Sequence, residues 1–137
     1  EPGARVGLTE EIVRRDCLGS EPRFTILLAE AVGMVFGGVV LLDAYSSWAG
    51  APTCVVHDLF VGADARGRGV GRALLAATAQ RAVERGCCRV DVNVVAWNRR
   101  ARDFYESQGF REVADWRPYR LDADGLQRLV REETVPD

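Results

Sequence analysis

The sequence contains no lysine, because all 18 basic residues among its 137 are arginines. That absence excludes a Walker-type phosphate loop and a Schiff-base lysine. The single histidine, His57, cannot supply a multi-histidine zinc site, and we expect no metal. The net charge of -2 argues against a protein that binds nucleic acid through phosphate contacts.

Long apolar runs are also missing. The longest, residues 31–42, is too short to cross a bilayer, so we expect no membrane segment. The four cysteines show no C-x-x-C spacing, which favours reduced thiols in a cytoplasmic protein over a disulfide framework. Hydrophobic residues make up 47% of the chain, enough to build the core of one domain.

Turn residues divide the chain into short helices and strands. The expected helices cover residues 9–17, 69–85, 98–108 and 122–130. The expected strands cover residues 24–29, 33–45, 53–61, 89–95 and 110–121. Gly37 and Gly38 would bulge the second strand, and Pro118 would keep the last strand at an edge or a bulge. This order predicts an α/β layered fold with a mixed sheet.

A glycine-rich turn separates the third expected strand from the second expected helix. It reads Arg66-Gly67-Arg68-Gly69-Val70-Gly71. Such a turn leaves backbone N–H groups open at a helix N-terminus, where the helix dipole favours an anion. Glycine lets a phosphate approach closely, because no Cβ stands in the way. Most glycine-rich turns are only turns, so this pattern alone is weak evidence of a site.

A second motif begins 27 positions after Gly71, where residues 98–110 read N-x-x-A-x-x-F-Y-x-x-x-G-F. With the R-x-x-G-x-G turn before it, the sequence resembles the GNAT superfamily of N-acetyltransferases. Residues 45–50, 56–61 and 96–98 further resemble the branch that acts on spermidine, spermine and thialysine. The resemblance extends from about Leu8 to about Leu129.

The resemblance implies a fold and a co-substrate. It implies a central mixed, mostly antiparallel sheet flanked by helices. Members normally begin with a strand and a helix before the segment near Leu8, so we expect residues 1–137 to be one GNAT domain, incomplete at its N-terminus. It also implies acetyl-CoA as co-substrate and a homodimer. The residues expected to bind the cofactor are Leu59, Phe60, Val61, Arg66, Gly67, Arg68, Gly69, Val70, Gly71, Arg72, Asn98, Ala101 and Phe104.

Direct acetyl transfer from a thioester to an amine sets three requirements. The amine must lose a proton, the tetrahedral oxyanion needs a donor, and the leaving thiolate needs a proton. A backbone N–H from residues 58–61 could be the oxyanion donor. In the family, a tyrosine of the helix that corresponds to residues 98–108 protonates the thiolate, and Tyr105 occupies that position. The alternative for Tyr105 is a core aromatic beside Phe104.

His57 stands where the resembling branch has glutamate. Imidazole changes charge between about pH 5 and 8, so His57 could accept the amine proton directly or through water. It could equally be a histidine with only a structural role on the strand. Asp58 could hold a cationic substrate, and Trp48 could wall the substrate site or be a core or interface aromatic. Unless a bulge intervenes, strand alternation puts His57 and Asp58 on opposite faces.

Two departures from the branch weaken a polyamine assignment. Ser46 and Ala96 stand where the branch has acidic residues, and a polycation pocket relies on several carboxylates. We predict an N-acetyltransferase that acts on a primary amine of a small cationic substrate, such as a diamine, a polyamine, thialysine or an amino-acid-like amine. Two alternatives stay open: a peptide or protein N-acetyltransferase, and a non-catalytic module that binds acyl-CoA.

Overall fold

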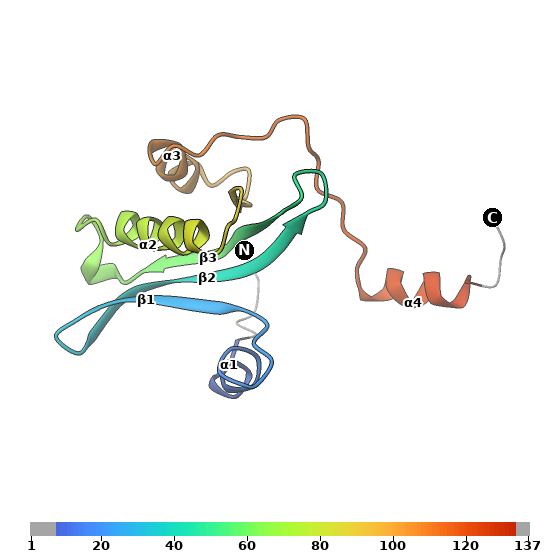
Figure 1. The fold of residues 1–137 in the computed structure, drawn as a ribbon, viewed down its shortest axis with the longest axis horizontal. Coiled ribbons are helices and arrows are strands. Elements are labelled where there is room, and N and C mark those ends of the chain that lie inside the picture. Colours follow the sequence, from blue (N-terminus) through green and yellow to red (C-terminus); the bar gives the residue numbers. More distant parts are fainter. Residues whose placement is uncertain (1–7, 134–137) are drawn as a thin grey trace. The chain divides into compact units, whose positions relative to one another are not determined.

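The computed structural model describes residues 8–133 (Figure 1). The chain divides into two compact units, one ending at Phe104 and the other beginning at Tyr105. The first unit holds α1 (Glu10–Asp16), β1 (Thr25–Ala31), β2 (Met34–Ser46), β3 (Ala51–Val61), the 3-10 turn η1 (Ala63–Ala65), α2 (Val70–Glu84) and β4 (Val90–Val92). The remaining helices are α3 (Arg99–Ser107), which spans the boundary, and α4 (Ala123–Arg131). None of the helices in the described range is long and apolar enough to cross a membrane.

The sheet is mixed and has the strand order β1-β2-β3-β4. β1 pairs antiparallel with β2, and β2 antiparallel with β3. β3 and β4 run parallel. The expectation of a mixed, mostly antiparallel sheet is therefore confirmed. β4 covers only three residues near the start of the strand predicted over residues 89–95.

The core lies between α2 and one face of the sheet. α2 contacts β1, β2 and β3, and it buries Leu74, Leu75, Thr78 and Ala82. Arg85 of this helix pairs with Asp43 of β2 at 3.0 Å. Since alternate residues of a strand share a face, Leu41 lies on the same face as Asp43, and its partner Val56 is only 1% exposed. We call this the helix face of the sheet and the opposite one the outer face.

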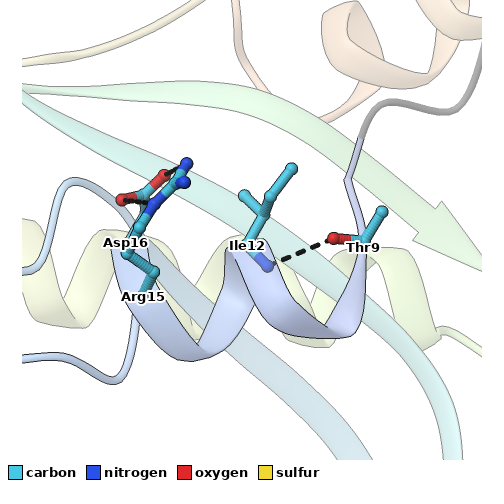
Figure 2. A network of polar contacts seen from close by, with 4 residues as sticks. All are labelled: Thr9, Ile12, Arg15 and Asp16. Atoms are coloured by element: carbon cyan, nitrogen blue, oxygen red, sulfur yellow. Dashed lines mark hydrogen bonds and ion pairs between the residues drawn. The ribbon is translucent and has the colours of Figure 1, made fainter.

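Side-chain caps define the first and last helices. Thr9 Oγ1 accepts a hydrogen bond from the Ile12 N–H at 3.2 Å (Figure 2). At the other end of α1, Arg15 hydrogen-bonds Asp16, which lowers the pKa of that carboxyl. Asp122 Oδ1 accepts from the Gly125 N–H at 2.9 Å and begins α4. The predicted helix starts at residues 9 and 122 are confirmed, because these signals are local.

The second unit corrects one prediction. Residues 110–121 form no strand, so the strand predicted there is wrong. Four of its aromatic and aliphatic residues recur every three positions, at 110, 113, 116 and 119, whereas an apolar strand face needs every second position. Pro118 also has no N–H to give to a neighbouring strand.

Candidate functional site

The glycine-rich turn lies where the sequence predicts it, between β3 and α2. Gly67 and Gly69 have φ angles of +78° and +76°, a region that side chains disfavour. A Cβ built on either glycine would meet nothing within 4 Å, so the requirement for glycine is conformational and the space is open. Gly69 is the N-cap of α2 and provides no side-chain hydrogen bond, unlike Thr9 and Asp122.

This turn suits the pyrophosphate of CoA. The first N–H groups of α2 receive no side-chain cap, and phosphate oxygens are suitable acceptors for N–H groups at a helix start. The exposed guanidinium groups of Arg66, Arg68 and Arg72 add positive charge around the turn, against one carboxylate at Asp64. The residues present therefore fit the phosphate end of the cofactor that the sequence predicts.

Phe104 lies close to the start of α2. The Phe104 ring carbon Cζ lies 3.0 Å from the position of the Cβ that Gly71 lacks, so a glycine here makes room for the ring. Asn98 begins α3, since its Oδ1 accepts from the Ala101 N–H at 3.1 Å. Gly71, Asn98, Ala101 and Phe104 thus have structural roles, and their contacts with the cofactor stay predictions.

β3 has a bulge at His57. Asp58 pairs with Val40 and Val56 pairs with Leu41, which leaves His57 as an extra residue without a partner on β2. The bulge shifts the alternation, so Val56 lies on the helix face and Asp58 on the outer face. The side chains of His57 and Asp58 are both exposed. Simple alternation does not hold at this point.

β3 and β4 separate directly before this bulge. Their pairing ends at Val56 and Val92, while β3 continues to Val61. The Gly62 N–H donates to the Phe36 carbonyl of β2 at 2.8 Å, which fixes the direction of the backbone groups before it. Alternation then directs the N–H groups of Leu59 and Val61 away from β2. In the described part of the chain, no strand pairs with that edge of β3 beyond Val56.

Two predicted site aromatics have different surroundings. Trp48 lies in the turn between β2 and β3 and is 88% exposed, so the core alternative for this residue is wrong. Tyr105 is half-buried, and its ring meets that of Phe110 edge to face, with centroids 5.3 Å apart. The packing role considered for Tyr105 is therefore present, although its partner is Phe110. Its role as an acid stays a prediction.

Metal ligands are not clustered in residues 8–133. No three or more His, Cys, Asp or Glu side chains there lie together in a way that could hold an ion.

The position of the Phe60 side chain was not predicted from the sequence. This side chain lies on the outer face of β3, beside Asp58. Gly38, the β2 partner of Phe60, could have indicated this position, but the sequence led us to expect a bulge at Gly38.

Two proteins similar in sequence to this chain are acetyltransferases with named substrates. A thialysine N-epsilon-acetyltransferase from Bos taurus is 27% identical over 137 residues, which cover 92% of this chain and 80% of that protein. An L-ornithine N5-acetyltransferase from Arabidopsis thaliana is 35% identical over 96 residues, covering 70% of this chain and 42% of the relative.

Solved structures share the fold. An integron cassette protein from the mobile metagenome of V. cholerae matches with a TM-score of 0.80 at 23% identity, covering 92% of this chain and 80% of that one. Residues 4–110 match the acetyltransferase (GNAT) family, which uses acetyl-CoA as co-substrate. The chain belongs to the GNAT family and is an acetyl-CoA-dependent N-acetyltransferase.

Proposed function

We propose that this acetyltransferase acts on a primary amine of a small cationic substrate, such as a diamine, thialysine or an amino-acid-like amine. The observation that carries the proposal is the bulge at His57, next to the point where β3 and β4 separate. There an exposed imidazole and an exposed carboxylate lie beside two backbone N–H groups at an open strand edge. The thialysine and ornithine acetyltransferases among the relatives support an amine of this class.

Residues proposed to bind the cofactor follow this edge of β3 directly in the chain. The turn at residues 66–69 and the first turn of α2 bind the pyrophosphate, and Arg66, Arg68 and Arg72 add charge. Acetyl-CoA, when bound, supplies an acetyl thioester. The Leu59 or Val61 N–H donates to the carbonyl oxygen as it becomes negative, which is where a fixed donor lowers the barrier most.

Four side chains complete the proposed site. His57 removes the proton from the attacking ammonium, directly or through water. Asp58 attracts the cationic substrate, and Trp48 forms a wall of the substrate site. Tyr105 protonates the leaving thiolate, a role that rests on its place in the F-Y motif of the family. A homodimer is a further proposal that rests on the resemblance alone, and light scattering on the purified protein tests it. A cytoplasmic location is also a proposal, and it rests on the cysteine pattern of the sequence.

An amine panel with acetyl-CoA, read by thiol release, tests the proposed function. We expect release with at least one diamine, thialysine or ornithine. No release above the blank with any small amine, together with thermal stabilisation by CoA, would instead identify a non-catalytic acyl-CoA-binding module. Release only with peptides would favour a peptide N-acetyltransferase.

Two variants separate the catalytic roles. Tyr105→Phe should lower kcat while leaving CoA affinity unchanged. His57→Gln should lower kcat/KM for the amine while leaving CoA affinity unchanged, because the attacking ammonium then loses its proton acceptor. A His57→Gln variant with the kcat/KM of the wild type would contradict His57 as the base.

A further inference from the structure

The outer face of β3 carries a charged and an aromatic residue side by side. Asp58 pairs with Val40, and Phe60 pairs with Gly38, so the two side chains leave the same face of the strand. Residues two apart on a strand are separated by about 7 Å. Without the bulge at His57, both would lie on the helix face beneath α2. The bulge therefore moves both side chains, the Phe60 ring and the Asp58 carboxylate, to the outer face.

Gly38 fixes the position of that ring. Phe60 Cζ and Cε1 lie 2.6 and 3.0 Å from the place where a Cβ of Gly38 would be. Leu28 Cδ2, from the next strand, lies 3.2 Å from the same place. Any larger residue at position 38 would displace the ring. Phe60 is nevertheless 47% exposed and Leu28 53% exposed, so the ring is held in place on one side and open to solvent on the other.

An aromatic face, a carboxylate and an aliphatic side chain together match one kind of ligand. An alkylammonium group binds a carboxylate through its charge and an aromatic face through the cation–π interaction, and its methylene chain packs on apolar side chains. The attacking amine must lose its proton, so it cannot remain a cation throughout the reaction. The group bound at this surface is therefore a second ammonium that stays charged.

The geometry points to Phe60 as a specificity-determining residue, whose ring, with Asp58 and Leu28, binds a second, non-reacting ammonium group of the acceptor. This inference rests on the proposed function, because it takes the edge beside His57 as the place of reaction. It names the substrate class more narrowly: molecules with two amino groups joined by a short aliphatic chain. Phe60 thus contributes through its side chain in addition to any contact made by its backbone.

Steady-state kinetics with 1,4-diaminobutane and butylamine test the inference. We expect Phe60→Leu to raise KM for the diamine about three- to tenfold, the range that one cation–π contact supplies. The subsite is read from the ratio of KM for the diamine to KM for butylamine, because a change in cofactor binding at Phe60 affects both amines alike. Phe24→Leu is the matched control, since this aromatic residue directly precedes β1 and lies outside the site; it should leave this ratio unchanged.

A second measurement keeps the two proposals separable. Calorimetric titration with 1,4-diaminobutane, without acetyl-CoA, reports the subsite even if no amine is acetylated. Weaker binding in both Phe60→Leu and Asp58→Asn supports the subsite, and absence of turnover in the wild type then overturns only the proposed function. An unchanged diamine KM in an active Phe60→Leu variant overturns the subsite. So does a wild type that neither binds the diamine nor prefers it to butylamine.

Discussion

The two halves of β3 differ in pairing, burial and chemistry. Residues 51–56 are paired with β2 and include the three pairs with β4, and Thr53, Cys54 and Val56 are buried there. Residues 58–61 pair with β2 alone, His57 has no partner on β2, and His57, Asp58 and Phe60 are exposed. The bulge at His57 is the boundary. One strand thus combines a core segment with a segment whose edge is open for a ligand.

α2 repeats this division. Its last turn lies over the first half of β3, because Arg85 pairs with Asp43, whose β3 partner is Cys54. Its first residue, Val70, lies 3.3 Å from the Cβ position of Gly37, the partner of Val61. We call the first region the closed end and the second the open end. Substitutions at the closed end should change stability, and those at the open end should change binding.

The largest expected difference in stability is between Val56 and Asp58, on either side of the bulge. Val56→Ala should lower the free energy of unfolding by about 2–3 kcal/mol, because it removes two methyl groups from a fully packed position. Asp58→Ala should change it by less than about 0.5 kcal/mol, as for other exposed positions. Urea unfolding measures both. Equal losses would mean that the open half of β3 is as tightly packed as the closed half.

Two glycines at opposite ends of α2 provide a matched pair. Gly69 and Gly86 have φ of +76° and +73°, and neither has an atom near its missing Cβ. Alanine at either position should cost about 1–2 kcal/mol of stability through left-handed backbone strain. Only Gly69→Ala should also weaken CoA binding, by about tenfold, because it disturbs the N–H groups of the glycine-rich turn that we propose binds the pyrophosphate. Calorimetric titration with CoA distinguishes the two variants. Equal CoA affinities in both would mean that the phosphates bind elsewhere.

Local signals explain which parts of this fold could be predicted. All four helices begin and end within one or two residues of the predicted bounds, since Thr9, Gly86 and Asp122 act on their own neighbours. The three long strands were predicted from their apolar runs. The strand over residues 110–121 failed because its apolar residues lack a period of two. β4 is shorter than predicted, since a strand lasts only as long as its partner stays beside it.

The bulge at His57 could not be predicted from its own sequence. It exists because Leu41 pairs with Val56 while Val40 pairs with Asp58, a register set by contacts between strands. The bulge predicted at Gly37 and Gly38 illustrates the same limit. The extra residue of β2 is instead Phe36, because Ala29 pairs with Gly37 and Glu30 with Val35. Gly38 instead leaves space for the Phe60 ring, a neighbour 22 positions away along the chain.

Cysteine reactivity should distinguish the closed end from the surface. All four cysteines are free thiols, with Cys88 exposed and Cys54 buried. Burial, with a smaller effect of Cys87, raises the pKa of the Cys54 thiol above its ordinary value of 9.0. A maleimide should therefore label Cys88 first and Cys54 last, with the Cys54→Ala variant losing the slowest phase. Rapid labelling of Cys54 in the native protein would contradict a closed end.

The raised pKa of Cys54 makes the stability of the protein depend on pH. The thiol is neutral and the thiolate charged, so a raised pKa means that the folded protein keeps this proton to a higher pH than the unfolded chain. The contribution of Cys54 to stability is complete below about pH 9 and decreases as the pH rises further. The free energy of unfolding of the wild type should therefore decrease more steeply above pH 9 than that of Cys54→Ala. Parallel curves for the two proteins would contradict this.

The smallest effect is expected from the Arg85–Asp43 ion pair, although it joins α2 to β2 at the closed end. Its side chains are 50% and 58% exposed, and the 3.0 Å contact is screened by solvent. A double-mutant cycle with Arg85→Gln and Asp43→Asn should give a coupling of about 0.5 kcal/mol or less, which decreases further in high salt. The closed end would then depend on apolar packing around Val56. A coupling well above 1 kcal/mol would show that charge pairing, and not burial, distinguishes this end of the molecule.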